Sequence, residues 1–452
     1  MQSFWKRLPA AARALLAAGG VLALSLALTF ALHNQDTWRT GLWDDTSQSL
    51  VFGRILQMQH GQSAPGGFLG TYAVDGDTAG NRYLFRENAV PDPDTFISYS
   101  HQTGLQGAAF GILNKVYSLF AKGGEARERM LYATNAVLFY AATLVLAGAA
   151  WRVFGPLAGA GWLAAAVFSP WLQRGMKDIY WCTWTWLLPA LAGLAVWALA
   201  RRRGRVPPWG YALVFAAVLV RCMCGFEFIS DFLILCEIPL FAAWAQALAA
   251  RRPARCWFGR MAGAGFAAVG GVLAALGVWL WQNRLYFGSW GAAWANVLEA
   301  STRHTVGGEM SIPAVIGQYV FSQDPVLQFG PLALPPLALV VLGAAALALY
   351  ALAQKRRGGP GLFPALASVW GLSLLAPLSW MALAKMHCQI HTHLVPMLWN
   401  FALAPATLLA LGALAHQALR PAGVATGLPP LSKGGGTAAG RDGGIALRRA
   451  AA

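Results

Sequence analysis

The stretch MAGAGFAAVGGVLAALGVWLWQ (residues 261–282) decides the fold, because it holds no charged side chain over a length that can cross a bilayer. In a helix, about 20 residues cover the roughly 30 Å of hydrocarbon. Charged residues form only 12% of the whole chain, against roughly 25% in a typical soluble domain. Similar stretches lie near 14–32, 132–150, 154–170, 182–200, 207–226, 229–249, 331–353, 361–384 and 394–415. The sequence therefore predicts an all-α polytopic membrane protein with about ten transmembrane helices.

The net charge of +16 is distributed unevenly between the connecting segments. If the N-terminus is cytoplasmic, the cytoplasmic segments hold 20 of the 34 basic residues and a single acid, Asp442. The rest of the chain holds 14 basic and 17 acidic residues. This is the positive-inside bias that orients membrane proteins, so it predicts cytoplasmic N- and C-termini. The basic composition therefore reports topology and argues against a nucleic-acid partner.

The two ends of the chain need separate interpretation. A basic start followed by an apolar run is also typical of a cleaved signal peptide. The run from Leu15 to Leu32 is long for that purpose, and no small-x-small cleavage site follows it, so we predict a retained helix. Residues 421–452 are mostly Gly, Ala, Pro and Arg and predict a disordered cytoplasmic tail, which leaves 1–420 as the transmembrane domain.

Two long outer segments, 33–130 and 283–330, contrast with short cytoplasmic loops. Within the first, 46–59 and 105–120 carry apolar groups at helical spacing, which predicts amphipathic helices lying on the outer membrane surface. The Gly-, Pro-, Asp- and Asn-rich stretch 61–95 is typical of irregular loop. A membrane protein that concentrates its loop length on one face is expected to function on that face.

The acidic pair Asp44–Asp45 follows the first span closely and is the first candidate site. A carboxylate at the outer surface can act as a general base on a hydroxyl or can hold a divalent cation. The alternative is structural, because acidic residues also stabilise a helix N-terminus. Spacing alone leaves both interpretations open.

The second candidate cluster lies in AKMHCQIHTHLVPMLWN (384–400) and contains Lys385, His387, His391 and His393. Histidines four residues apart share a helix face, whereas 391 and 393 share a face only in extended chain. A bend in this segment would therefore let all three converge on a metal ion or on an anionic phosphate. The alternative is a polar loop that happens to be rich in histidine.

The third candidate cluster is RCMCGFEFISD (221–231), with Arg221, Glu227 and Asp231 around a turn between two spans. Ionisable groups near membrane depth are usually paired or functional, so an Arg–carboxylate pair that fastens two helices is the structural alternative. Glu237 lies deeper in the next span, and we assign it no role. The cysteines at 182, 222, 224, 236, 256 and 388 show no metal-type pairing except Cys222-x-Cys224, whose side chains would point in different directions on one helix, and all six are interpreted as buried residues without a chemical role.

No nucleotide-binding motif is present, which argues against a nucleotide substrate. The layout of one span, a long outer loop opening on an acidic pair, and a second outer loop between later spans resembles the multispanning glycosyltransferases of the GT-C superfamily. The segments FISYSHQTGLQG (96–107), GFEFIS (225–230) and QIHTHLVPMLWN (389–400) look like those of bacterial members.

The resemblance implies a membrane enzyme that takes a sugar from a polyprenyl-phosphate donor on the outer face of the bacterial inner membrane. Asp45 or Asp44 would be the general base. Arg221, Glu227, Lys385, His387, His391 and His393 would be the substrate-binding residues, since the developing phosphate charge needs cationic groups or a divalent metal ion. Membrane lipid would be the surrounding partner. The alternatives are another polymerase or ligase of lipid-linked glycans, or a transporter or flippase.

Overall fold

The computed structural model describes residues 9–33, 44–73, 80–305, 308–357, 361–392 and 394–419. Eight helical segments in this part are long and apolar enough to cross a membrane, so the chain is an all-α membrane protein in its main body. These segments are α2 (Ala10–His33), α6 (Gly124–Phe154), α9 (Trp184–Arg203), α11 (Ile229–Ala249), α12 (Arg255–Phe287), α15 (Pro336–Arg357), α16 (Phe363–Leu383), and the run from Val395 to Ala418 that contains η4 (Val395–Met397), α18 (Leu398–Phe401) and α19 (Leu403–Ala418).

Two further predicted spans are also helical but shorter. Helix α7 (Pro156–Phe168) has 13 residues and α10 (Pro208–Met223) has 16. At 1.5 Å per residue they extend only about 20 and 24 Å. Helix α8 (Pro170–Gly175) follows α7 after the single residue Ser169, whose hydroxyl caps it. All ten predicted stretches are therefore mainly helical, while the number that crosses a membrane stays a prediction.

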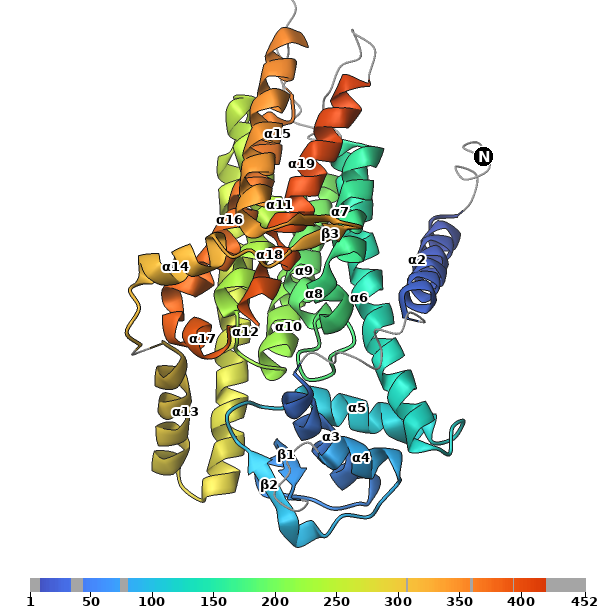
Figure 1. Ribbon diagram of the computed structural model, residues 1–452. Coiled ribbons are helices and arrows are strands. Elements are labelled where there is room, and N and C mark those ends of the chain that lie inside the picture. The colour runs from blue at the N-terminus through green and yellow to red at the C-terminus, as the bar shows by residue number, and fades with distance from the viewer. Residues whose placement is uncertain are drawn as a thin grey trace, which may run out of the picture.

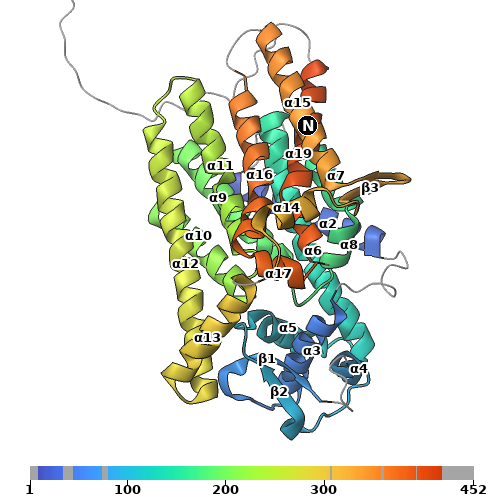
Figure 2. The ribbon, with the colours of Figure 1, turned by 60° about the vertical axis from the view of Figure 1, so that its left-hand side comes forward.

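The bundle has two different ends (Figure 1). The connection from α11 to α12, the end of α15 and the start of α16 lie together at one end (Figure 2). The opposite end carries a small layer of short helices and strands that includes α3 and β1. The basic residues of the α9–α10 and α11–α12 connections therefore lie far from this layer.

We call residues 44–73 and 80–123 the cap. It contains α3 (Asp45–Gln59), η2 (Pro65–Gly67), β1 (Leu69–Tyr72), α4 (Gly80–Arg86), η3 (Pro93–Thr95), β2 (Phe96–Tyr99) and α5 (Leu105–Tyr117). The helices α3 and α5 have nearly the bounds predicted from their apolar spacing. The prediction of irregular loop over 61–95 was wrong for β1 and α4. Antiparallel pairing of β1 with β2, which is distant in sequence, stabilises the strand (Leu69 opposite Tyr99).

The cap packs closely because glycines let its backbone segments approach. A Cβ added to Gly53 of α3 would lie 2.0 Å from the Gly70 carbonyl oxygen of β1. Around this contact Val51, Phe52 and Ile55 are fully buried and belong to the same apolar core as the bundle. The cap is therefore continuous with the bundle and has no separate core.

Polar contacts fasten the cap to the bundle. Glu128, near the start of α6, is buried and accepts from both Arg82 and Arg86 of the cap. On α12, the Trp279 indole donates to the Ser100 carbonyl (2.9 Å), and the Gln282 amide donates to the Thr103 carbonyl (3.1 Å). Removing one partner of a buried ion pair lowers the stability of the fold. These contacts therefore favour a single arrangement of the cap on the bundle.

Helix α12 continues past the predicted start of the second long segment, to Phe287. After it come α13 (Trp290–Thr305), α14 (Ile312–Val320) and the hairpin of β3 (Leu327–Phe329) and β4 (Leu332–Leu334). The short helix α17 (Lys385–Ile390) lies beside α13 and α14 (Figure 2). The predicted tail, 421–452, lies outside the described residues.

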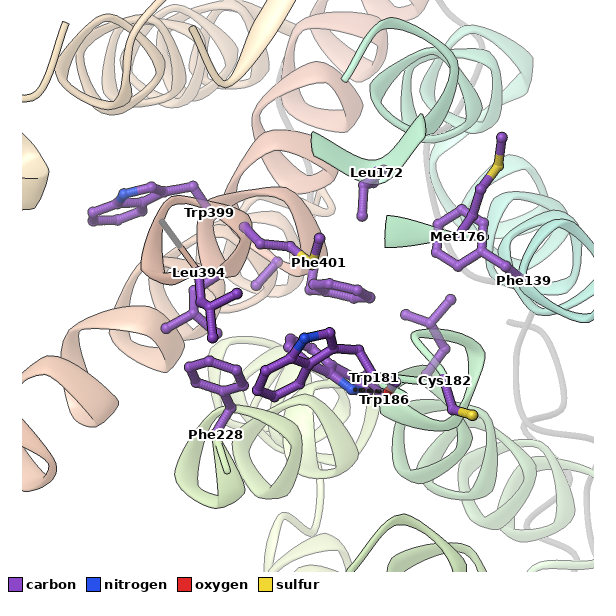
Figure 3. Packing of buried hydrophobic residues seen from close by; sticks show 14 of the residues in the cluster. Phe139, Leu172, Met176, Trp181, Cys182, Trp186, Phe228, Leu394, Trp399 and Phe401 are labelled. Atoms are coloured by element: carbon purple, nitrogen blue, oxygen red, sulfur yellow. Dashed lines mark hydrogen bonds between the residues drawn. The ribbon is translucent and has the colours of Figure 1, made fainter. Parts of the chain in front are cut away.

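An apolar cavity of about 120 Å³ lies inside the bundle, between α6, α7, α9, α11, α16 and α19. Phe401 forms part of its wall and stacks on Trp186, with ring centroids 4.5 Å apart. Trp186 in turn meets Phe228 at 4.9 Å. We call Trp186, Phe228 and Phe401 the aromatic layer (Figure 3). Phe401 lines the cavity, and Trp186 lies 5.1 Å from the Arg221 guanidinium, so the layer lies between the cavity and the polar residues beneath the cap.

Candidate functional site

Asp44 is held in place by two hydrogen bonds. It has left-handed backbone angles (φ 58°, ψ 58°), which Asp tolerates better than most residues. One carboxylate oxygen caps α3 by accepting from the Ser47 backbone N–H at 3.2 Å. The other accepts from the indole N–H of Trp181 at 3.1 Å. Asp44 therefore caps the start of α3, as one interpretation predicted, and also contacts a distant loop, which leaves a functional role open to it. Asp45 begins α3, and its side chain lies outside the described part.

Trp181 belongs to the loop 176–183, which sequence reasoning did not connect with the acidic pair. The Asp178 carboxylate accepts from the backbone N–H groups of Tyr180 and Trp181, both at 2.9 Å. The Asn135 amide of α6 donates to the backbone carbonyls of Met176 and Asp178. These bonds fix the loop, so the indole N–H is already oriented toward Asp44.

Glu227 is presented by the tight turn between α10 and α11. Gly225 (φ 146°) and Phe228 (φ 62°) both have positive φ values there. The φ of Gly225 is one that L side chains rarely adopt, so this position favours glycine; a Cβ there would also lie 2.3 Å from a Glu227 carboxylate oxygen, which would have to move. Arg221 donates to the Glu227 backbone carbonyl at 2.9 Å. The residues predicted as an Arg–carboxylate pair thus meet through the backbone of the turn.

Arg221 itself is only 1% exposed. Its guanidinium lies 5.1 Å from the Trp186 ring centroid and 5.3 Å from that of Phe232. Cation–π contacts of this kind stabilise a buried arginine. Arg221 therefore lies behind the turn and supports Glu227. Its side chain has almost no exposed surface that a substrate could contact.

Tyr99, at the end of β2, and Tyr180 lie near both carboxylates and near each other, since the charges of Glu227 and Asp44 act on both phenols. Burial raises the pKa of Tyr99 to about 12, and the charges of Glu227 and Asp44 act in the same direction. Burial also raises the pKa of Tyr180 well above its usual value, with Tyr99, Glu227 and Asp44 adding to it. Both phenols therefore stay protonated and can donate hydrogen bonds near neutral pH.

Glu227 has an environment that favours its protonated form. Burial raises its pKa, and the nearby Asp44 charge adds to this, whereas Arg221 and His391 oppose it. Like charges in one site push one carboxyl toward its neutral form. These electrostatic contacts bring together Asp44, Glu227 and His391, which lie in three distant parts of the sequence.

The histidine cluster is only partly assembled. His387 is 1% exposed, its Nδ1 lies 3.4 Å from the donating indole nitrogen of Trp380, and its ring lies 5.2 Å from Phe228. The His391 ring stacks 4.8 Å from that of His387 and is half-buried. Lys385 donates instead to the Met310 carbonyl at 3.2 Å, toward the α13–α14 connection. His393 lies outside the described residues.

Two groups near the site were missed by sequence reasoning. His101 stacks beside Tyr99 (5.3 Å) and its Nε2 lies 3.5 Å from a Glu299 carboxylate oxygen on α13. Burial lowers the pKa of His101, Glu299 opposes this, and Arg303 of α13 lowers it further. Arg303 is exposed, and its charge also reaches Tyr99. A cationic side chain therefore borders the site from α13, a helix without a recognisable motif.

A divalent metal ion does not fit the residues described. No three His, Cys, Asp or Glu side chains converge on one point in that part of the chain, which leaves out His393 and the Asp45 side chain. Both Asp44 oxygens already accept hydrogen bonds from nitrogen. We therefore derive no step through a metal.

The site has two tiers. The half-buried side chains are Asp44, Tyr99, Glu227 and His391. The buried side chains that hold them are Tyr180, Trp181, Arg221 and His387. A fixed carboxylate, a carboxyl that favours protonation, phenol donors and an imidazole can together bind and deprotonate a hydroxyl-bearing substrate.

Comparison with known proteins yields no relative: no family model, no curated protein and no solved structure matches this chain.

Proposed function

We propose that the protein is a membrane glycosyltransferase of the GT-C kind. It moves a sugar from a polyprenyl-phosphate donor to a hydroxyl of a glycan, lipid or protein. The observation that carries the proposal is the Asp44 carboxylate, oriented by Trp181 and Ser47 and close to Glu227, Tyr99 and Tyr180. A general base must be held in position before it can accept a proton, and the Asp44 carboxylate is held in this way.

In this reaction Asp44 accepts the proton of the acceptor hydroxyl. The hydroxyl oxygen attacks the anomeric carbon, and the bond from that carbon to the phosphate oxygen breaks. The polyprenyl phosphate leaves with the bonding electrons. We assign His391 and Arg303, whose charges act on Glu227 and Tyr99, to stabilising the phosphate, and the phenols of Tyr99 and Tyr180 to orienting hydroxyls. Asp45 and His393 remain candidates from the sequence.

The proposed location is the bacterial inner membrane, with the cap on the extracytoplasmic face. Its support is the charge distribution, because the basic α9–α10 and α11–α12 connections lie at the end away from the cap. Both termini are then cytoplasmic. A lipid-linked donor is consistent with a site that lies next to spanning helices.

The test is deletion of the gene in its host, followed by mass spectrometry of surface glycans and lipid-linked sugars. The deletion strain is complemented with wild type, Asp44→Asn or Asp45→Asn at equal protein level. Asp94→Asn is the matched control, since Asp94 is an exposed cap carboxylate. We expect a missing sugar that wild type and Asp94→Asn restore and that Asp44→Asn does not. An unchanged glycan profile in the deletion strain would refute the proposal.

A transporter is the second candidate, because α11 carries two buried or half-buried carboxylates. Asp231 is 2% exposed, and neither its oxygens nor those of Glu237 have a hydrogen-bond partner in the described part of the chain. Ionisable groups inside spanning helices often belong to ion or proton pathways. If Asp231→Asn abolishes function while Asp44→Asn does not, the transporter is favoured. Loss at His391 or Arg303, with full function in Asp44→Asn, favours another lipid-linked glycan polymerase or ligase.

A further inference from the structure

Two cysteines interpreted from the sequence as unconnected lie side by side next to the site. Cys182 belongs to the loop 176–183 and Cys224 follows the last turn of α10. The two thiols are close enough to affect each other's ionisation, and the Cys182 thiol also donates to the Ile179 carbonyl at 3.1 Å. Both are free thiols in this structure, and they are 2% and 6% exposed. Figure 3 shows Cys182 at the edge of the buried cluster, beside Trp181 and Trp186.

The backbones around the two cysteines are also joined directly. The side-chain nitrogen of Gln106, on α5, donates to the Tyr180 carbonyl at 3.1 Å and to the Cys224 carbonyl at 3.0 Å. One amide nitrogen therefore holds the two segments together. The nearness of the two segments thus follows from the packing of α5 against both of them.

The two segments are those that present the site's carboxylates. The loop 176–183 orients Asp44 through Trp181, and the turn after Cys224 carries Glu227. A covalent link between the cysteines would fix these segments relative to each other. Disulfides persist in oxidising compartments and are rare in the cytoplasm, so the compartment at the cap end decides whether such a link forms.

We propose that Cys182 and Cys224 form a disulfide in the mature protein. The inference rests on the orientation in the proposed function, which exposes the cap end to an oxidising compartment. The cysteine pair is oxidised by exchange with an oxidised thiol–disulfide oxidoreductase, whose own disulfide is reduced. One thiolate attacks the oxidant's disulfide and forms a mixed disulfide, and the second thiolate then displaces the oxidant. Two cysteine thiols and one disulfide become one disulfide and two oxidant thiols.

A thiolate is the attacking species in exchange, and either cysteine can supply it. Because both thiols are buried in the closed fold, exchange takes place while the cap is still packing onto the bundle.

The test counts free thiols in the full-length protein. Membranes are quenched with acid, denatured and alkylated with N-ethylmaleimide, with and without prior reduction, and the protein is analysed by mass spectrometry. We expect two fewer labels than the six cysteines without reduction, six labels after reduction, and a linked peptide pair that contains Cys182 and Cys224. Full labelling of the unreduced wild type, or a link that involves Cys222, overturns the inference.

Variants provide the controls. Cys182→Ser should give full labelling without reduction, whereas Cys236→Ser, which removes a buried cysteine on α11, should keep the link. A reductant should lower the melting temperature of the wild type by a few degrees and leave that of Cys182→Ser unchanged. Equal responses of the two proteins to the reductant count against the link.

The inference and the proposed function can fail separately. If Asp44 is needed for glycan transfer and all six thiols are free, the disulfide is refuted and the transferase stands. If the link is found and the deletion strain has normal glycans, the transferase is refuted and the disulfide stands.

Discussion

The polar site under the cap and the apolar cavity inside the bundle lie on opposite sides of the aromatic layer. The two regions are built from different kinds of residue. The site combines two carboxylates, two phenols and an imidazole from segments distant in sequence. The cavity is lined by Leu, Ala, Val, Ile, Pro, Phe and Trp side chains. Phe401 borders the cavity and contacts Trp186, which supports Arg221 of the site.

The difference shows where recognition of a polar molecule can occur. The cavity has no ionisable side chain in its lining, so it can distinguish molecules only by shape and apolar contact. At the site, hydrogen bonds orient the polar groups in sequence: Asp178 holds the Trp181 backbone, and the Trp181 indole donates to Asp44. Substitutions can change the site itself, the aromatic layer between the two regions, or the hydrogen bonds that orient the site. Their expected effects decrease in the order that follows.

Removing the charge of Asp44 should have the largest effect, because the site loses its base while the cavity is untouched. In Asp44→Asn the amide oxygen can still accept from the Trp181 indole, so the fold is expected to persist. Loss of a general base costs about 10²–10⁴ in rate. The measurement is transfer of labelled sugar in membranes with equal amounts of protein. A loss below about threefold, far under the range for a general base, would show that Asp44 only caps α3.

Truncating Phe401 should destabilise the bundle, because its ring lines the cavity and packs on Trp186. Phe401 is 2% exposed, and burial lost in Phe→Ala changes typically costs about 3–5 kcal/mol. Thermal unfolding in detergent, followed by fluorescence, gives the change in melting temperature of Phe401→Ala. The control is Phe266→Ala on α12, whose side chain is 79% exposed and should matter little. Equal melting temperatures for the two variants would mean that the aromatic layer contributes no packing energy.

Removing one hydrogen bond to Asp44 should have a smaller effect. Trp181→Phe keeps an aromatic ring and deletes the indole N–H that orients the carboxylate. A hydrogen bond to a charged group contributes roughly 1.5–3 kcal/mol, so we expect kcat to fall at least about tenfold with KM nearly unchanged.

The control for Trp181 is Trp184→Phe. The Trp184 indole nitrogen has no hydrogen-bond partner among the described residues, so this variant should keep its activity. If both variants lose activity equally, the effect reflects packing of the tryptophans and not orientation of Asp44.

Glu227 should give the smallest effect, visible as a pH dependence. Burial raises its pKa in the folded protein above the usual value of 4.5. The folded state therefore binds this proton more tightly than the unfolded state. The stability from this group is fully present below pH 4.5 and is lost as pH rises through the raised pKa. Compared with Glu227→Gln, the wild type should lose melting temperature as pH rises over that range.

The control for Glu227 is Glu87→Gln, which changes an exposed cap carboxyl. Melting curves of this variant and of the wild type should change in parallel with pH. A wild-type curve that also stays parallel to that of Glu227→Gln would mean that the pKa of Glu227 is the same in the folded and the unfolded protein.

The sequence by itself determined the helices of the bundle. Long stretches without charge cannot expose their backbone in hydrocarbon, so they form helices whatever lies around them. It also located α3 and α5, because apolar spacing within one segment reports the face that is buried. The acidic pair, the turn at Glu227 and the histidine cluster could each be proposed from local composition.

Only the tertiary structure decided which of these meet. Trp181 lies far from Asp44 in the chain, and no local pattern shows that its indole donates to that carboxylate. The β1–β2 pairing and the contact between Cys182 and Cys224 are equally invisible, because each joins segments from different connections. Hydropathy fixes whether a segment is buried, whereas the ends of several helices must pack together before their loops can share one site.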